Sequence, residues 1–393
     1  EPKPDAPFSA LVFKTISELH VGELSFFRIF SGTLKSGVEV YNANNGSTEK
    51  IGQIYLMNGK ERKEVGILHV GDIGAVVKLK NTHTGNTLCQ KNDPILLPEI
   101  AFPEPVIRVA VVPKAKGDEE KISIGLAALH EEDPTFNMVI DSELKQIIVS
   151  GQGELHLDIV VKRLKDKYGV EVDFTEPRIP YRETIKGKAE GQYKHKKQSG
   201  GRGQYGDVYL RLEPRGRGEG FEFLNEIVGG VIPGKYIPAV EKGVRESMVE
   251  GVMAGYPVVD LSVALYFGSF HTVDSSDMAF KIAGLMCFKK LFKEANPVLL
   301  EPIYDVEVQV PEEYMGDVMG DISSRRGKIL GMESEGTFQM IKAKVPLAEL
   351  YKYSTTLRSM TQGRGIHRRK FSHYEEVPRE IAEKIIEQSE KEK

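Results

Sequence analysis

One order of predicted strands and helices occurs twice along this sequence, and it limits the folds that the chain can adopt. In each copy a strand and a helix are followed by two strands, a helix and a last strand, over residues 106–174 and 306–374. This βαββαβ order is typical of ferredoxin-like domains. We therefore predict ferredoxin-like domains at residues 104–178 and 298–377.

The helices of the two copies follow from the spacing of their apolar residues. In the first copy a helix is predicted from Glu154 to Tyr168, with Gly169 as a left-handed terminator. Its apolar face consists of Leu157, Val160, Val161, Leu164 and Tyr168. In the second copy the helices are predicted at residues 312–324 and 347–361.

Residues 1–103 have a different pattern, in which turn sequences such as Asn44-Asn45-Gly46 and Thr84-Gly85-Asn86 separate short strands. Many short strands of this kind predict a closed β-barrel. Pro98, Pro103 and Pro105 follow, and prolines so close together favour an extended linker. The first domain boundary is predicted there.

Residues 179–297 begin with strands around a glycine-rich loop and end with two helices. One helix is predicted from Pro238 to Ala254, and the other after Asp274-Ser275, which would be its cap. Residues 378–393 form a short charged helix, which must pack on another domain because so short a helix is marginal alone in water. The whole chain is thus predicted to be a multidomain α+β protein.

Charge and cysteine content exclude several classes of protein. Lys and Arg number 53 against 57 Asp and Glu, so a uniformly basic protein that coats nucleic acid is excluded. Cys89 and Cys287 lie far apart, which predicts neither a disulfide framework nor a metal site and favours a reducing compartment. No apolar run is long enough to span a membrane, and residues 1–5 do not resemble a signal peptide. We expect a cytoplasmic protein without a membrane partner, and a first residue other than Met raises the alternative of a fragment.

A glycine-rich loop contains the most conspicuous motif, G-x-G-x-x-G. Its residues are Gln198, Ser199, Gly200, Gly201, Arg202, Gly203, Gln204, Tyr205 and Gly206. A dinucleotide site needs an apolar strand before the glycines and a helix after them, whereas here basic residues precede and an alternating strand follows. The V-A-I-K, H-R-D and D-F-G motifs of a protein kinase are absent. We expect no cofactor at this loop.

The charge around this loop is locally basic. Nine Lys and Arg residues stand between Lys186 and Arg217 against three acidic residues, and Tyr193 and Tyr205 are interleaved with them. Cations that contact phosphates and rings that stack on unpaired bases are the usual means of holding single-stranded RNA. The alternative is a solvated hairpin tip whose glycines only make the turn. The residues alone leave both interpretations open.

Two further segments carry candidate residues. His271 and Asp274 lie in a loop before a predicted helix, where the carboxylate is explained by capping and a lone histidine more often has no function. No nucleophile motif or metal-ligand spacing accompanies them, so no catalytic or metal-binding residue is predicted.

A basic stretch is a candidate for contact with an RNA backbone or is a strand edge protected by charge. It consists of Arg358, Arg364, Arg368, Arg369 and Lys370.

Nearly the whole chain resembles bacterial elongation factor G without its GTPase domain. The segments that carry the resemblance, in the order of the family's second to fifth domains, are 8–14 and 26–32, 133–136 and 150–157, 198–206 and 271–276, and 301–303 and 316–321. The resemblance implies that residues 179–297 have a ribosomal-protein-like fold that mimics the anticodon arm of a transfer RNA. Its tip, from Gln198 to Tyr205 with His271 and Asp274, would contact tRNA and mRNA in the decoding region.

The resemblance also implies partners for the rest of the chain. The basic stretch at 358–370 would contact rRNA of the large subunit, and residues 378–393 would return to the tip domain. The chain lacks G-x-x-x-x-G-K-[ST], so GTP and Mg²⁺ are expected only in an upstream GTPase domain. We expect a monomeric, ribosome-binding portion that couples GTP hydrolysis to movement of tRNA and mRNA. The alternatives are a ribosome-recycling paralogue and a complete ribosome-binding module without nucleotide.

Overall fold

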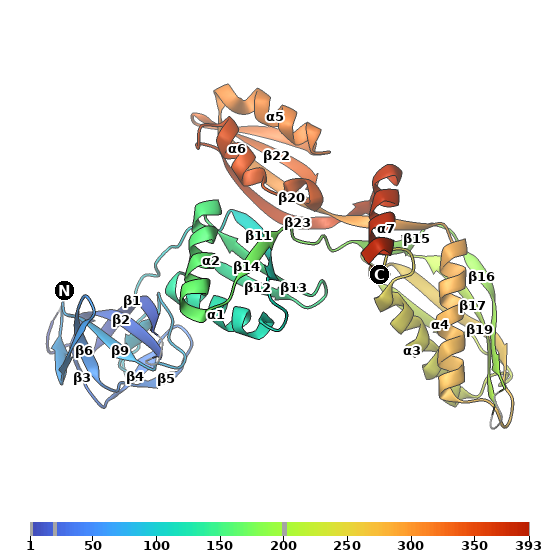
Figure 1. The fold of residues 1–393 in the computed structure, drawn as a ribbon, viewed down its shortest axis with the longest axis horizontal. Coiled ribbons are helices and arrows are strands. Elements are labelled where there is room, and N and C mark those ends of the chain that lie inside the picture. The colour runs from blue at the N-terminus through green and yellow to red at the C-terminus, as the bar shows by residue number, and fades with distance from the viewer. Residues whose placement is uncertain (1–2, 19–21, 199–202, 393) are drawn as a thin grey trace. The chain divides into compact units, whose positions relative to one another are not determined.

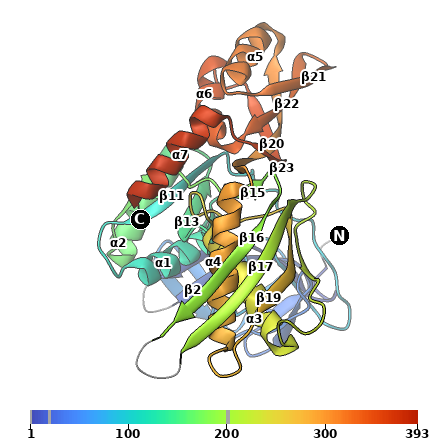
Figure 2. The same ribbon diagram turned by 90° about the vertical axis from the view of Figure 1, so that its right-hand side faces the viewer.

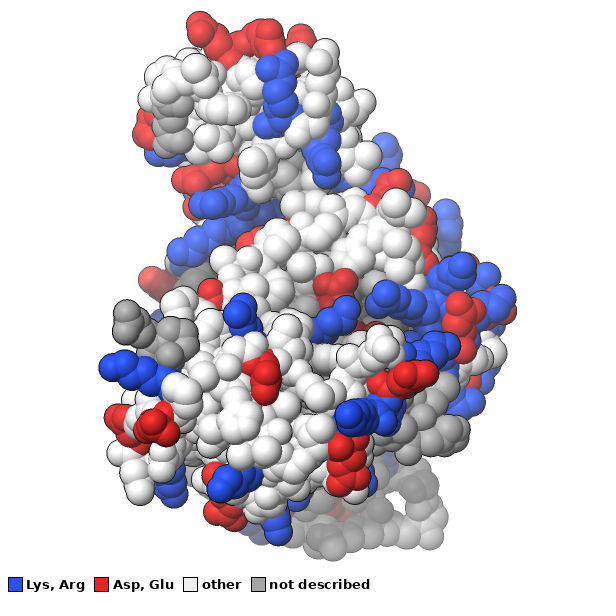
Figure 3. All heavy atoms as spheres, turned by 90° about the vertical axis from the view of Figure 1, so that its left-hand side faces the viewer, with Lys and Arg blue, Asp and Glu red and all other residues white. Residues whose placement is uncertain are grey.

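The computed structural model describes residues 3–18, 22–198 and 203–392, which form two compact units (Figure 1). One unit is Glu1–Arg178 and the other is Ile179–Lys393, and each is described by itself. Within the described ranges, no helix is long and apolar enough to span a membrane. On the face drawn in Figure 3, basic and acidic side chains are interspersed between large uncharged areas, in keeping with the net charge of -4.

The first unit begins with an antiparallel sheet of eight strands in the order β5-β4-β10-β1-β2-β9-β6-β7. The strands are β1 (Ser9–Glu18), β2 (Gly22–Ser31), β4 (Glu39–Asn42), β5 (Thr48–Lys50), β6 (Ile54–Asn58), β7 (Glu61–Val65), β9 (Ile73–Val77) and β10 (Thr87–Cys89). A two-stranded ribbon of β3 (Thr33–Lys35) and β8 (Ile67–His69) adds Leu34 and Leu68 to the same core. The predicted barrel is therefore found as a sheet around one core, although no ladder joins β5 to β7 in the described part of the chain.

The second part of this unit has the predicted βαββαβ order. It consists of β11 (Ile107–Pro113), α1 (Glu119–Glu132), β12 (Asn137–Asp141), β13 (Gln146–Gly151), α2 (Glu154–Tyr168) and β14 (Val172–Thr175). The sheet order β12-β13-β11-β14 is that of a ferredoxin-like domain. Gly169 ends α2 with a φ of 67°, in the left-handed region predicted for this terminator. Gly125 lets the two helices approach, because a Cβ there would lie 2.5 Å from Leu164 Cδ1.

The second unit contains the tip domain, which we define as residues 179–296. Its sheet has the order β16-β17-β19-β18, and two helices cover one face. The elements are β15 (Arg182–Ile185), β16 (Ala189–Lys197), β17 (Gln204–Pro214), β18 (Phe221–Asn225), the 3-10 turn Gly234–Tyr236, α3 (Ile237–Glu250), β19 (Leu261–Ser269) and α4 (Asp277–Glu294). Only β18 and β19 are parallel among the described pairs of this sheet. Figure 2 shows β16, β17 and β19 side by side.

Helix α3 ends at Glu250, four residues before the predicted end at Ala254. Gly251 breaks the helix with a φ of 73°. The five N–H groups of residues 252–256 donate instead to the fully buried carboxylate of Glu183. A strand residue thus holds the loop after the helix, which helical spacing alone does not reveal.

The last part of this unit is the second ferredoxin-like domain. It consists of β20 (Pro297–Pro311), α5 (Met315–Ser324), β21 (Lys328–Glu335), β22 (Phe338–Pro346), α6 (Tyr353–Met360) and β23 (Ile366–Glu376), with strand order β21-β22-β20 and β23 on the other side of β20. Both predicted helices begin with 3-10 turns, at Glu312–Tyr314 and Leu347–Leu350. Strand β20 is 15 residues long, and its first part pairs with β15.

The C-terminal helix α7 (Arg379–Glu392) packs its apolar stripe on a small cluster within this unit. The stripe consists of Ile381, Ala382, Ile385 and Ile386, and the cluster of Tyr181, Ala254, Leu299 and Val377. Tyr181 and Ala254 of the tip domain and Leu299 of β20 therefore anchor this helix. This contact provides the burial that a short charged helix needs.

Candidate nucleic-acid interface

The glycine-rich loop follows β16 and leads into β17, and these two strands form a hairpin. Lys197 pairs with Gln204 and Lys196 with Tyr205 at its end. Ser199, Gly200, Gly201 and Arg202 lie outside the described residues. Their predicted RNA contacts stay predictions, and the site is built from the residues on either side.

The loop of residues 270–276 lies beside the hairpin end, as the resemblance implied for the two tip loops. Tyr205 N donates to the carbonyl oxygen of Asp274 at 2.9 Å, and Ser275 Oγ donates to the carbonyl oxygen of Tyr205 at 3.0 Å. Gly203 N donates to Asp274 Oδ1 at 3.1 Å. A Cβ at Gly203 would lie 3.0 Å from the Asp274 carboxyl carbon, so a larger residue there would press against this carboxylate. Asp274 therefore holds the two loops together.

The predicted cap of α4 is corrected by one residue. Ser276 is the N-cap, and its Oγ accepts from Ala279 N at 3.2 Å. Ser275 Oγ instead accepts from His271 N at 2.9 Å and binds the hairpin. Because Asp and Ser are both good N-cap residues, residue type alone could not identify which of Asp274, Ser275 and Ser276 caps the helix.

The backbone hydrogen bonds of His271 favour one tautomer. Its Nδ1 accepts from Val273 N at 3.3 Å and Asp274 N at 3.1 Å, both closer than the Asp274 Oδ2 at 3.4 Å, which favours the hydrogen on Nε2. The side chain is 51% exposed, and its ring centroid lies 6.1 Å from that of Tyr205. The site therefore offers an exposed N–H donor next to an aromatic ring.

A partly buried hydrogen-bond network holds Tyr205. Its hydroxyl is 2.8 Å from Ser269 Oγ, which donates to Asp207 Oδ2 at 2.7 Å. Gln192 Nε2 donates to the other carboxylate oxygen of Asp207 at 2.7 Å. Sequence reasoning counted Asp207 only as an acid opposing the basic patch, and missed this role because nothing local marks the residue as buried.

Four cations of the predicted basic patch are paired within the domain. Lys188 binds Glu213 at 3.2 Å, Arg211 binds Glu226 at 2.8 Å, Arg215 binds Glu219 and Glu222 at 3.7 Å, and Lys194 Nζ lies 3.9 Å from Asp207 Oδ2. Lys196 and Lys197 differ, because both are exposed and neither has an ion-pair partner in the described ranges. Unpaired positive charge is thus found at the end of the hairpin, next to the glycine-rich loop.

The second basic stretch does not form one surface. Arg364 is held by Glu313 and by the hydroxyl of Tyr314 at 2.7 Å. Arg358 is exposed at the end of α6. Strand alternation places Arg368 and Lys370 on one face of β23, opposite Glu307 and Asp305 of β20, and Arg369 on the other face. Contact of these residues with rRNA stays a prediction, and cross-strand charge pairing gives weight to the interpretation as a protected edge.

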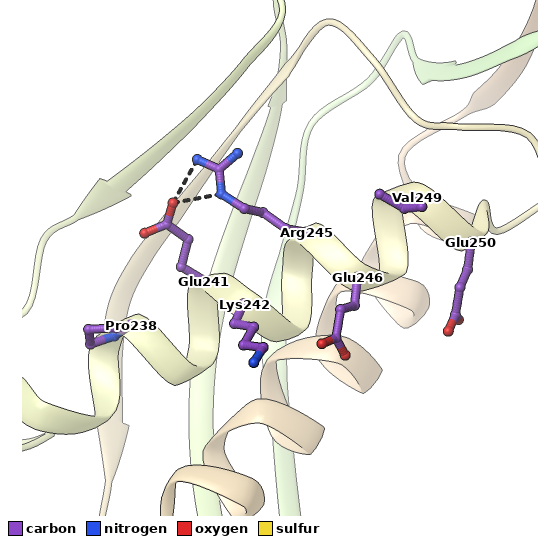
Figure 4. Close-up of a pocket in the computed structure, with 7 residues that line it drawn as sticks. All are labelled: Pro238, Glu241, Lys242, Arg245, Glu246, Val249 and Glu250. Atoms are coloured by element: carbon purple, nitrogen blue, oxygen red, sulfur yellow. Dashed lines mark hydrogen bonds and ion pairs between the residues drawn. The ribbon is translucent and has the colours of Figure 1, made fainter. Parts of the chain in front are cut away.

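A hollow of about 520 Å³ lies along α3 (Figure 4). Its lining consists of Pro238, Glu241, Lys242, Arg245, Glu246, Val249 and Glu250. Glu241 and Arg245 pair with each other at 2.7 Å, and Figure 4 shows no convergence of the remaining side chains. Elsewhere in the described part of the chain, no group of three His, Cys, Asp or Glu residues could hold a metal ion.

Four family models match the chain one after another. Elongation factor G domain 2 matches residues 7–91, and elongation factor G domain III matches residues 102–176. Domain IV of elongation factor G matches residues 177–296, and the elongation factor G C-terminus matches residues 298–385. None of the four is the GTP-binding domain.

Among solved structures, a crystal structure of a protein from Thermus thermophilus is similar to this chain, with a TM-score of 0.85 and 43% sequence identity. The similarity covers 99% of this chain and 58% of the other. This chain therefore spans somewhat more than half the length of that protein.

Proposed function

The chain belongs to the elongation factor G family, with its second, third, fourth and C-terminal domains, and we propose that it is the ribosome-binding portion of an elongation-factor-G-like translational GTPase. In this proposal an upstream domain binds GTP and Mg²⁺. Hydrolysis there is coupled, through the domains described above, to movement of tRNA and mRNA on the ribosome.

The observation that carries this proposal is the attachment of the two tip loops to each other. Asp274 accepts from Gly203 N and Tyr205 N, so the hairpin end and the His271 loop form one unit. Preorganised loops lose less conformational entropy on binding than separate flexible loops would. The ammonium groups of Lys196 and Lys197 could contact phosphates, and the Nε2–H of His271 could donate to an acceptor on RNA.

We propose that the chain's own residues bind neither a nucleotide nor its metal. No G-x-x-x-x-G-K-[ST] stands in the sequence, and the G-x-G-x-x-G match runs into strand β17 and not into a helix N-terminus that could face a phosphate. We therefore assign no catalytic step to these residues. Their proposed part is to bind, to position RNA and to transmit movement.

The test uses the full-length protein with His271→Ala and, from the resemblance, Arg202→Ala. Single-turnover translocation, read by a fluorescent mRNA, should slow at least tenfold, whereas ribosome-stimulated GTP hydrolysis should stay within twofold. Glu190→Gln, an exposed residue of β16 away from the loops, is the matched control. Unchanged translocation in both tip variants would contradict the assigned role.

Two measurements separate the alternatives. A full-length protein that splits ribosomal subunits but does not move mRNA would favour recycling. A natural product of this size that sediments with ribosomes, with affinity falling as salt rises, would favour a module without nucleotide.

A further inference from the structure

The sheet of the tip domain has one face that its helices leave open. Val208, Leu210 and Leu212 of β17 point to the core beneath α3 and α4. The alternate residues of β17 therefore point to the opposite face. We call this the open sheet face, and its tip-proximal half consists of Lys194, Lys196, Tyr205, Tyr209, Tyr266 and Phe267.

Aromatic rings form a cluster on the open sheet face. Tyr209 lies between Phe267 and Tyr266, with ring centroids 5.2 Å and 6.0 Å away and both contacts edge to face. Phe267 is 47% exposed, which is high for a phenylalanine in the middle of a folded domain. An edge-to-face pair leaves a ring face free for a planar partner.

Charge on the open sheet face changes along the strands. Near the tip, Lys196 stands opposite Tyr205, and Lys194 Nζ lies 5.8 Å from the ring of Tyr205. Toward the other end Arg211 is already bound by Glu226 and Glu213. Asp207, between the two ends, is buried, accepts hydrogen bonds from Ser269 and Gln192, and lies 3.9 Å from Lys194 Nζ. The two lysines outweigh this one carboxylate, and Lys196 has no ion-pair partner in the described ranges. Net positive charge and aromatic rings therefore coincide only in the tip-proximal half.

We propose that the tip-proximal half of the open sheet face binds single-stranded RNA, with bases stacked on Phe267 and Tyr209 and phosphates beside Lys194 and Lys196. Aromatic rings on an open sheet with lysines alongside match the chemistry of an unpaired strand, and a sheet of this kind holds about two or three bases. Tyr205 belongs to both this face and the glycine-rich loop, so the strand would continue from the tip loops onto the sheet. This inference rests on the proposed function in placing RNA at the tip domain.

The test measures binding of a fluorescein-labelled single-stranded RNA dodecamer, and of its duplex, to this chain by anisotropy at several salt concentrations. Phe267→Leu should weaken single-strand binding at least about fivefold, which is the smallest effect expected for the loss of one stacked base. The slope of log affinity against log salt should stay unchanged. Lys196→Gln should lower the slope of log affinity against log salt by about 0.7, one phosphate contact to a single strand. Phe371→Leu is the matched control, because Phe371 is also 47% exposed but lies on β23.

Equal affinities of the Phe267→Leu and Phe371→Leu variants would overturn the inference, as would duplex binding as tight as single-strand binding. Loss of ribosome co-sedimentation in Phe267→Leu without loss of RNA binding would identify a ribosomal protein as the partner and also overturn it. If His271→Ala slows translocation while Phe267→Leu leaves RNA binding unchanged, the inference fails and the proposed function stands. Thermal unfolding of each variant checks that the exposed substitutions leave the fold intact.

Discussion

Replacing Glu183 with alanine removes an acceptor that five consecutive N–H groups share. Val252 and Met253 donate to Oε2 at 2.7 and 2.8 Å, and residues 254–256 donate to Oε1 at 2.8 to 3.2 Å. The bond from Ala254 is fully buried, whereas the other four are partly buried. Water can therefore replace some of the lost acceptor, but not at Ala254.

The size of the effect follows from this difference. About 1.5 kcal/mol for the buried bond, the low end for a bond to a charged group, and about 0.5 kcal/mol for each of the four bonds that water can partly replace give a loss of about 3.5 kcal/mol. For a unit of roughly 200 residues this lowers the unfolding temperature by about 7–14 °C. Glu183→Gln keeps one carbonyl oxygen but turns an NH₂ group toward the other donors, so its loss should be intermediate.

Calorimetry of the two variants measures the shift, and hydrogen exchange shows whether the amides of residues 252–256 lose protection first. Glu190→Ala, in the same domain but exposed, should change stability by no more than about 0.5 kcal/mol. A loss below about 1 kcal/mol in Glu183→Ala, or one equal to that of the control, would refute the reasoning.

Three further predictions concern single residues of the second unit. Burial, together with the charge of Arg369, lowers the pKa of His367 to about 4 from 6.5. Between these values only the unfolded state binds the proton, so the free energy of unfolding should fall as pH falls from 6.5 to 4, and in His367→Gln the free energy measured by urea titration should depend less on pH there. Burial raises the pKa of the Cys287 thiol to about 12 from 9.0. Only the unfolded thiol ionises between these values, so stability should fall as pH rises from 9 to 12, and less so in Cys287→Ala. Reaction of the native thiol with iodoacetamide at pH 8 would be contrary evidence. Gly206→Ala would place a Cβ 2.6 Å from the carbonyl oxygen of Ala279, so α4 must move and the unit should lose about 1–3 kcal/mol by thermal unfolding, with no loss arguing against this close contact.

The ferredoxin-like domains could be predicted because their signals are local. The apolar spacing of Leu157, Val160 and Leu164 and the glycine after Tyr168 are read within one helix, and the strand order then follows from the βαββαβ sequence. The end of α3 could be predicted only in part. Gly251, which breaks the helix, is a local signal, whereas Glu183, whose carboxylate binds the loop after it, lies about seventy residues earlier.

The candidate site was predictable in its residues more than in their roles. The glycines, His271 and Asp274 stand out by composition, and two of the loops meet at Tyr205 and Ser275. Their roles depend on the tertiary structure, because the 270–276 loop packs against the hairpin end. Asp274 therefore binds the hairpin, and Ser276 is left to cap the helix. The ring cluster of Tyr209 and Phe267 was missed, since a β-bulge beside Tyr209 in the β17–β19 pairing decides which residues share its face.

Strand β20 has a mechanical consequence. Its 15 residues, at about 3.3 Å each, make a continuous rod of about 50 Å that pairs with β15 at one end and with β22 and β23 along the rest. A load applied to the tip domain along this rod acts in shear, so many hydrogen bonds across the ladders resist it together. A flexible linker at the same place would stretch before it transmitted force. The tip domain and the last domain should therefore respond to a push at the tip as a single stiff lever.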